Sequence, residues 1–142
     1  MVRAGGVVAV KDVDMQLMKV FPGNPFLLSH LAEASVRGHA VTVQSRGSLR
    51  GRELRRWLEE AGLHDVRQRT FLIERWAPLS VQDRRFFGDW LAFLADAALH
   101  RGIPVDDRPE WESLVDPEAE NNPVNQPDFY LCEGQVLATG TV

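Results

Sequence analysis

The chain begins with an apolar run that predicts a strand buried on both faces. Two glycines precede residues 7–10, and these four residues are all apolar. A continuous apolar run is typical of strands inside a parallel sheet, and its β-branched side chains favour a strand over a buried helix. The strand is predicted to end near Lys11 or Asp12. An irregular link broken by Pro22 and Pro25 follows it.

Apolar residues at helical spacing predict two helices in the first half of the chain. The first covers residues 26–36 and follows Asn24, a residue type that caps helix N-termini. The second starts at Ser48 or Gly51 and stops at Gly62, a typical C-terminal residue. These two helices lie between the first and second predicted strands.

A third helix, over residues 80–101, has the strongest pattern in the chain. Ser80 and Asp83 have the spacing of a capping box, with Asp in the place of the usual Glu. One broad apolar face is predicted, made of Phe86, Phe87, Trp90, Leu91, Leu94, Ala97 and Ala98. Phe93 lies off this face, so it is predicted to contact something other than the core.

The remaining segments complete a chain of the α/β class. Residues 64–76 alternate and then become apolar, which predicts a strand. Residues 128–142 predict a last strand, bent or split at Gly134, while residues 39–47 fit either a loop or a short strand. Residues 105–127 are acidic and broken by prolines, which predicts a surface loop with a short helical turn.

Composition excludes several classes of protein. The 142 residues are 44% hydrophobic and 25% charged, typical of one globular domain. A net charge of -4 disfavours nucleic acid as a partner, because phosphate binding requires a basic face. No apolar run approaches the roughly 20 residues that cross a bilayer, so no membrane partner is expected. The single cysteine, Cys132, is consistent with a cytoplasmic location.

Three stretches, in this order, resemble the C-terminal half of a class I S-adenosylmethionine-dependent methyltransferase. Residues 2–14, VRAGGVVAVKDVD, are similar to the passage leading into the family's fifth strand, with Ala4 where proline is usual. Residues 52–71, RELRRWLEEAGLHDVRQRTF, resemble the penultimate helix and strand. The matching positions are Leu54, Leu58, Ala61, Gly62, Leu63 and Val66. Residues 128–142 lie where the family's last, antiparallel strand would be.

The resemblance implies a partial methyltransferase domain over residues 1–142. It would be the C-terminal portion of a Rossmann-like sheet, about three strands with flanking helices, incomplete at its N-terminal side. The helix at 80–101 would be an insertion and 105–127 an acidic loop. The implied cofactor is S-adenosylmethionine, but no glycine-rich turn follows a strand, so its site is expected upstream of Met1. The chain alone is then expected to be inactive.

Four residues are candidates for binding a small-molecule acceptor. The resemblance implies that Asp12 or Asp14, near Lys11 at the carboxyl end of the first strand, faces the acceptor as a hydrogen-bond acceptor or general base. Two solvated or capping acids are the alternative. His30 can face a substrate cleft, although a histidine on a helix surface is the favoured interpretation. Phe93 belongs to an aromatic helix that either forms core or covers the acceptor as a lid.

The other reactive residue types predict no further site. The four histidines lack the close spacing of metal ligands, and Cys132 lies in an apolar strand. An arginine cluster over residues 46–56 is interpreted as a solvated helix face. The alternative function is a non-catalytic α/β binding or dimerisation module, which completes its sheet with a second copy or with a missing N-terminal half.

Overall fold

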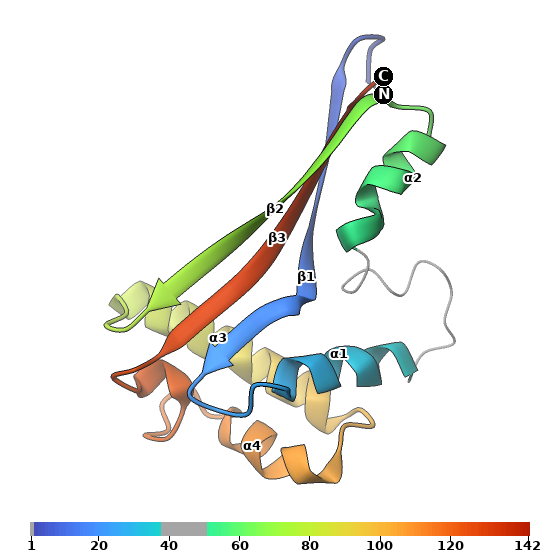
Figure 1. Ribbon diagram of the computed structural model, residues 1–142. Helices are drawn as coiled ribbons and strands as arrows, with labels where there is room; N and C mark the ends of the chain where they lie inside the picture. The colour runs from blue at the N-terminus through green and yellow to red at the C-terminus, as the bar shows by residue number, and fades with distance from the viewer. Residues whose placement is uncertain (1, 38–50) are drawn as a thin grey trace.

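The structure, a computed structural model, describes residues 2–37 and 51–142 (Figure 1). The segment 39–47 and the alternative helix start at Ser48 lie outside the described residues. The strands are β1 (Val7–Phe21), β2 (His64–Trp76) and β3 (Tyr130–Thr141). The α-helices are α1 (Leu27–Arg37), α2 (Leu54–Glu60), α3 (Val81–Leu99) and α4 (Arg108–Ser113). Short 3-10 turns are η2 (Gly51–Glu53), η3 (Val105–Asp107) and η4 (Pro123–Asn125).

The three strands form one sheet in the order β1-β3-β2. The last strand of the chain is central, and it is antiparallel to both of its neighbours. Val7 and His64 both pair with Thr141, so β1 and β2 start at the same end of the sheet and run in the same direction. The prediction of a mixed α/β chain with three strands is confirmed, and each adjacent pair in its sheet is antiparallel.

Strand β1 is longer and more exposed than predicted. It continues from Val7 to Phe21, through the segment that was expected to be an irregular link. Val7 is 66% exposed, because β1 pairs with β3 alone among the described strands and helix α2 covers only one face at this end. The pairing is irregular between Asp14 and Lys19, where β1 bulges. Met18, within the bulge, is buried in the core.

Helices pack on opposite faces at the two ends of the sheet. At the upper end in Figure 1, α2 places Leu54 and Leu58 against Val136 and Ala138 of β3. At the lower end, Phe87 and Leu91 of α3 pack with Leu131, Phe129 and Val124. Because side chains alternate along a strand, Leu131 and Val136 point to opposite faces. Each end of the sheet therefore has one face that these helices leave uncovered.

Strand β3 runs through Gly134 without the predicted split. A side chain at Gly134 would collide with Leu17 of β1, whose Cβ lies 2.5 Å from the position that a Cβ would take. The glycine therefore lets the bulged part of β1 approach β3 closely.

The acidic segment 105–127 is more than the surface loop that was predicted. It contains η3, α4 and η4, and its charged side chains are mostly exposed while Trp111 is completely buried. A cluster of α1, α3, α4 and β1 side chains surrounds this tryptophan. Its buried members are Met18, Leu27, Leu28, Leu31, Leu94, Ala95, Ala98, Trp111 and Leu114. The segment thus supplies part of the main core.

Helix α3 agrees with the sequence prediction at its start. The Ser80 hydroxyl accepts a hydrogen bond from the Asp83 backbone N–H at 3.0 Å and donates one to the Asp83 carboxylate at 2.8 Å. Phe86, expected on the buried face, is 64% exposed. Phe93 is 68% exposed, as its position off the apolar face predicted.

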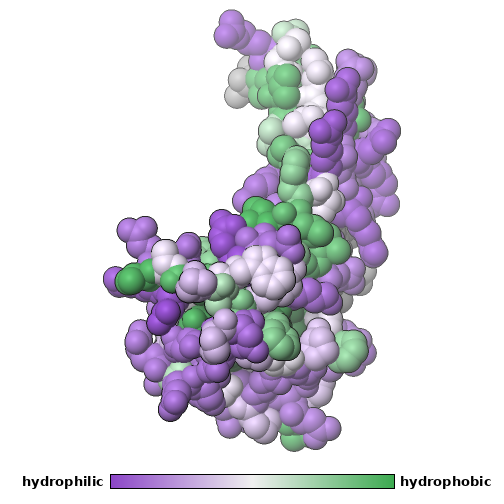
Figure 2. All heavy atoms as spheres, turned by 60° about the vertical axis from the view of Figure 1, so that its left-hand side comes forward, coloured by the Kyte–Doolittle hydropathy of each residue, from purple (hydrophilic) through white to green (hydrophobic). Residues whose placement is uncertain are grey.

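The surface of the narrow upper part carries apolar side chains between polar ones. Figure 2 shows a strip of apolar residues down this part and into the middle of the wider, lower part. Among the described residues, no helix has both the length and the apolar character needed to cross a membrane.

Candidate functional site

A groove opens where β1 and β2 end, and we call it the sheet-end groove. Its volume is about 580 Å³, within the range of roughly 300 to 1,000 Å³ that is usual for pockets that bind small molecules. It is lined by Lys19, Val20, Phe21, Gly23, Pro25, Trp76, Ala77, Pro127, Asp128, Phe129 and Tyr130. The groove lies at the carboxyl ends of β1 and β2.

Three aromatic side chains, here called the aromatic row, cross the floor of the groove. Phe21 and Trp76 both pair with Tyr130, so all three lie side by side on one face of the sheet. The rings of Trp76 and Tyr130 are 4.2 Å apart between centroids, with 40° between their planes. Phe21 is 49% exposed and Trp76 is 63% exposed. The row therefore presents aromatic surface to whatever enters the groove.

The Tyr130 hydroxyl is held by a carboxylate. It donates a hydrogen bond of 2.8 Å to Oε1 of Glu74, on the neighbouring strand β2. This hydrogen bond is the main reason that the pKa of Tyr130 is raised above its ordinary value. Desolvation and the neighbouring Cys132 raise this pKa further. The phenol therefore keeps its proton throughout the physiological range and contributes a neutral ring.

Two charged residues flank the aromatic row on opposite sides. Lys19 pairs with Cys132, which lies two residues further into the sheet than Tyr130. The Lys19 side chain lies on the same face of the sheet as the aromatic row. Asp128 lies two residues before Tyr130, on the side away from the sheet, and both charged residues line the groove. The groove thus combines an aromatic floor with one positive and one negative group.

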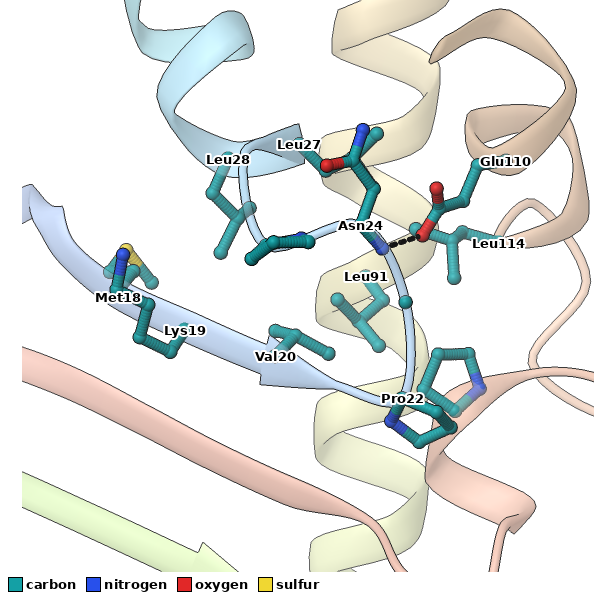
Figure 3. Close-up of a pocket in the computed structure, with 13 residues that line it drawn as sticks. Met18, Lys19, Val20, Pro22, Asn24, Leu27, Leu28, Leu91, Glu110 and Leu114 are labelled. Carbon is teal, nitrogen blue, oxygen red and sulfur yellow. Dashed lines mark hydrogen bonds between the residues drawn. The ribbon is translucent and has the colours of Figure 1, made fainter.

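A second, smaller pocket lies next to the groove (Figure 3). Its lining includes Met18, Leu27, Leu28 and Leu91, and its interior has room for about one water molecule. Both pockets share Lys19 and Val20 of β1, and Gly23 and Pro25 of the loop of residues 22–26 between β1 and α1. This β1–α1 loop is therefore the common wall of the two pockets.

The β1–α1 loop is fixed by two carboxylates from the acidic segment. The backbone N–H of Asn24 donates to Oε1 of Glu110 at 2.6 Å, the dashed line in Figure 3. The Asn24 side-chain amide donates to Oδ1 of Asp107 at 3.1 Å. Gly23 has a φ of +142°, and a Cβ there would lie 2.5 Å from Glu110 Oε1. Only glycine fits this conformation against that carboxylate.

His30, predicted as a substrate-binding candidate, interacts with the same acidic segment. Its Nδ1 lies 2.6 Å from Oδ2 of Asp107, which is buried, and its ring stacks on Phe26 with centroids 6.1 Å apart. His30 is not among the residues that line the groove or the smaller pocket. These contacts stabilise the start of α1 against η3.

Asp12 and Asp14 lie in the middle of β1, and the carboxyl end of that strand is Phe21. The expectation that they mark the strand end is therefore wrong. Asp14 is 7% exposed and accepts a hydrogen bond from the Gln16 backbone N–H at 3.0 Å. Neither aspartate lines the groove, and Phe93 projects from α3 without lining it either. Their roles in binding an acceptor stay predictions.

Asp12 has an altered acidity. Partial burial raises the pKa of its carboxyl group, a hydrogen bond from the Val13 backbone N–H at 2.8 Å opposes this, and the charge of Asp14 raises it further. A raised pKa makes a carboxylate a stronger base, which is the direction that suits a general base.

The sequence analysis did not predict the aromatic row, although residues near the ends of both outer strands, β1 and β2, indicate where these strands stop. Phe21 directly precedes Pro22, and Trp76 stands two residues before Pro78. Proline cannot donate to a sheet ladder, so an aromatic residue just before one marks the end of a strand. The sequence does not show that Tyr130 lies between the other two rings, because this depends on the pairing of three distant segments.

Among the described residues, no cluster of three or more His, Cys, Asp and Glu side chains could hold a metal ion. Compared with known proteins, the chain matches no family model and no curated protein.

Proposed function

We propose that this chain forms the acceptor side of a class I S-adenosylmethionine-dependent methyltransferase that acts on a small molecule. The observation that carries the proposal is the arrangement at the groove. Two strands run in the same direction, an antiparallel strand lies between them, and the groove opens at the shared carboxyl end of the outer two. The sequence resemblance implies a fifth, a penultimate and a last, antiparallel strand, and this arrangement is consistent with it.

The residues that carry the resemblance have matching structural positions. The Gly5-Gly6 turn leads into β1, and α2 ends just before Gly62 and the start of β2. Leu54 and Leu58, the leucine pair of the helix pattern, are buried against β3. These agreements support the proposal because each motif lies at the element boundary that the resemblance implies.

We propose that the S-adenosylmethionine site of this enzyme lies outside the described residues. A cofactor of this kind needs glycines after a parallel strand, where the backbone can approach the ligand. Gly23 follows β1, but the Glu110 carboxylate fills the space beside it. The cofactor site of the proposed enzyme therefore has to come from other residues, and no step of methyl transfer is assigned to this chain.

What the chain contributes is orientation and desolvation of the acceptor. Methyl transfer is a displacement in which correct placement of two reactants supplies much of the rate. The aromatic row provides a fixed surface for placing an acceptor, and the β1–α1 loop provides a wall anchored at 2.6 Å to Glu110. Asp12 or Asp14 would act as a base only for an acceptor that must lose a proton.

The proposal is tested on the native protein, isolated from its source cells. Its intact mass is measured, and it is irradiated with S-adenosylmethionine carrying a tritiated methyl group. We expect a mass above the 16.0 kDa of this chain, covalent labelling, and transfer of tritium to an extract of cellular small molecules. A native mass of 16.0 kDa with no labelling would refute the proposal that the chain is part of a methyltransferase.

A non-catalytic binding or dimerisation module is the second candidate, and exposed apolar side chains on β2 favour it. Phe71 is 48% exposed and Leu72 is 63% exposed, on opposite faces of a strand that lies at the edge of the described sheet. Exposed edges of this kind promote association. Light scattering of the purified chain over a range of concentrations tests this candidate, since a module of this kind would be dimeric at micromolar concentration.

A further inference from the structure

We propose that the sheet-end groove binds a planar aromatic small molecule, stacked on the aromatic row of Phe21, Trp76 and Tyr130. The inference deepens the proposed function, and rests on it, because it names the class of acceptor for the same groove. The binding step itself can be measured without cofactor or methyl transfer.

The spacing of the row suits a flat ring system. Adjacent strands of a sheet lie about 4.8 Å apart, so Phe21 and Trp76 are separated by roughly 10 Å across Tyr130. This distance is comparable to the van der Waals length of two fused six-membered aromatic rings. Aromatic rings prefer offset or tilted packing against other rings, which is the relation already present between Trp76 and Tyr130 at 4.2 Å.

The exposure of the row distinguishes it from the core. Trp76 is 63% exposed and Phe21 is 49% exposed, although Leu131, on the opposite face of the same end of the sheet, is 2% exposed. Exposed aromatic surface is unfavourable in water, and here it is gathered in a concave site instead of being scattered. Phe71 of β2 is also 48% exposed but lines no part of this groove, so it provides an aromatic comparison outside the site.

The charges around the row define the polar part of the ligand. Lys19 and Asp128 flank the row on opposite sides and have opposite sign, so the described lining residues carry no net charge. This favours a neutral or zwitterionic ring compound with polar substituents at its ends. The neutral phenol of Tyr130, held by Glu74, adds a ring without adding charge.

The test uses two probes of similar size, the aromatic 2-naphthol and its saturated counterpart 2-decalol. The chain has four tryptophans, so a nitrogen-15 correlation spectrum contains four indole N–H signals, and the loss of one in Trp76→Leu assigns Trp76. We expect 2-naphthol to shift the Trp76 signal in a saturable manner and to leave that of the fully buried Trp111 in place. The dissociation constant for 2-decalol should be about two- to tenfold larger, because a saturated ring cannot stack.

Variants separate the aromatic row from general apolar binding. Trp76→Leu should weaken 2-naphthol binding up to about tenfold, and Trp76→Phe should restore most of the affinity. The matched control Phe71→Leu, at an exposed aromatic residue of the same strand that does not line the groove, should leave the affinity unchanged. Equilibrium dialysis of 2-naphthol measures its binding to every variant, because the Trp76 signal is lost in the Trp76 variants. Far-ultraviolet circular dichroism verifies that each variant is folded.

Three results would overturn the inference. Equal binding of 2-naphthol and 2-decalol, or equal effects of the Trp76→Leu and Phe71→Leu variants, would mean that no aromatic site exists in the groove. A concentration-dependent dimer that Trp76→Leu dissociates would mean that a second copy covers the row. None of these results affects the labelling of the native protein by S-adenosylmethionine, so a failure of this inference is distinguishable from a failure of the proposed function.

Discussion

Replacing Glu110 by alanine should release the β1–α1 loop from helix α4. In the structure, Glu110 Oε1 accepts the backbone N–H of Asn24 at 2.6 Å, and this contact joins residues 86 positions apart in the chain. A hydrogen bond to a charged, partly buried acceptor contributes about 1.5 to 3 kcal/mol. Its removal leaves the Asn24 N–H without this partner, so we expect the free energy of unfolding to fall by about 2 kcal/mol.

Urea unfolding followed by circular dichroism measures this change directly. For a chain of this length, each kcal/mol also corresponds to about 3 to 5 °C in the melting temperature. The expected fall in melting temperature is therefore at least about 5 °C. Glu110→Gln keeps an acceptor oxygen but removes its charge, so it should lie between the wild type and Glu110→Ala.

Glu112→Ala provides a matched control on the same helix. Glu112 accepts from Nε of Arg108 at 3.0 Å, but both side chains of this pair are more than half exposed. Exposed pairs of this kind contribute about 0.5 kcal/mol or less. If Glu110→Ala destabilised the protein no more than Glu112→Ala does, the loop would not depend on this carboxylate and the reasoning would be wrong.

Three further substitutions test other parts of the structure. Asp12→Asn should stabilise the protein at pH 7. The pKa of Asp12 is raised in the folded state, so the Asp12 carboxyl group stabilises the fold below its ordinary pKa of 3.8, where it is protonated. This contribution is lost as pH rises through the pKa of the folded state. The advantage of Asp12→Asn in urea unfolding should therefore vanish as pH falls below about 3.8, and an advantage independent of pH would contradict the assignment. Leu91→Ala should cost about 2 to 5 kcal/mol in the same assay because Leu91 is 1% exposed in the core, and a cost below about 1 kcal/mol would show that this core is loosely packed. Ser80→Ala should cost about 1 kcal/mol by removing the N-cap of α3, whereas Ser80→Thr, which retains the hydroxyl that accepts from the Asp83 N–H and donates to its carboxylate, should cost much less.

The elements with a regular pattern could be predicted from the sequence. The apolar faces of α1 and α3 follow helical spacing closely enough to place Leu31 and Leu91 in the core, where both are 1% exposed. Strands β2 and β3 were also predicted within a few residues of their observed bounds. Local patterns were sufficient there because each element buries one side against a single neighbouring layer.

The rest depends on contacts between distant segments. The sequence prediction ended strand β1 too early, because the bulge places Met18 in the core without the alternation of a regular strand. The acidic segment looked like a surface loop because its exposed charges surround a single buried tryptophan, Trp111. The aromatic row could not be predicted, since the register that aligns Phe21, Tyr130 and Trp76 is set by the pairing of three strands.

The central position of β3 has a consequence for the order in which the sheet is made. Both outer strands pair with β3, and β3 is the last of the three to leave the ribosome. At about 5 to 20 residues per second, the interval between the synthesis of Trp76 and that of Thr141 is roughly 3 to 13 seconds. During this interval β1 and β2 lack the strand that pairs with them, and their apolar side chains are available to chaperones. The nascent chain therefore acquires its sheet, and with it the floor of the groove, only when translation has passed Thr141.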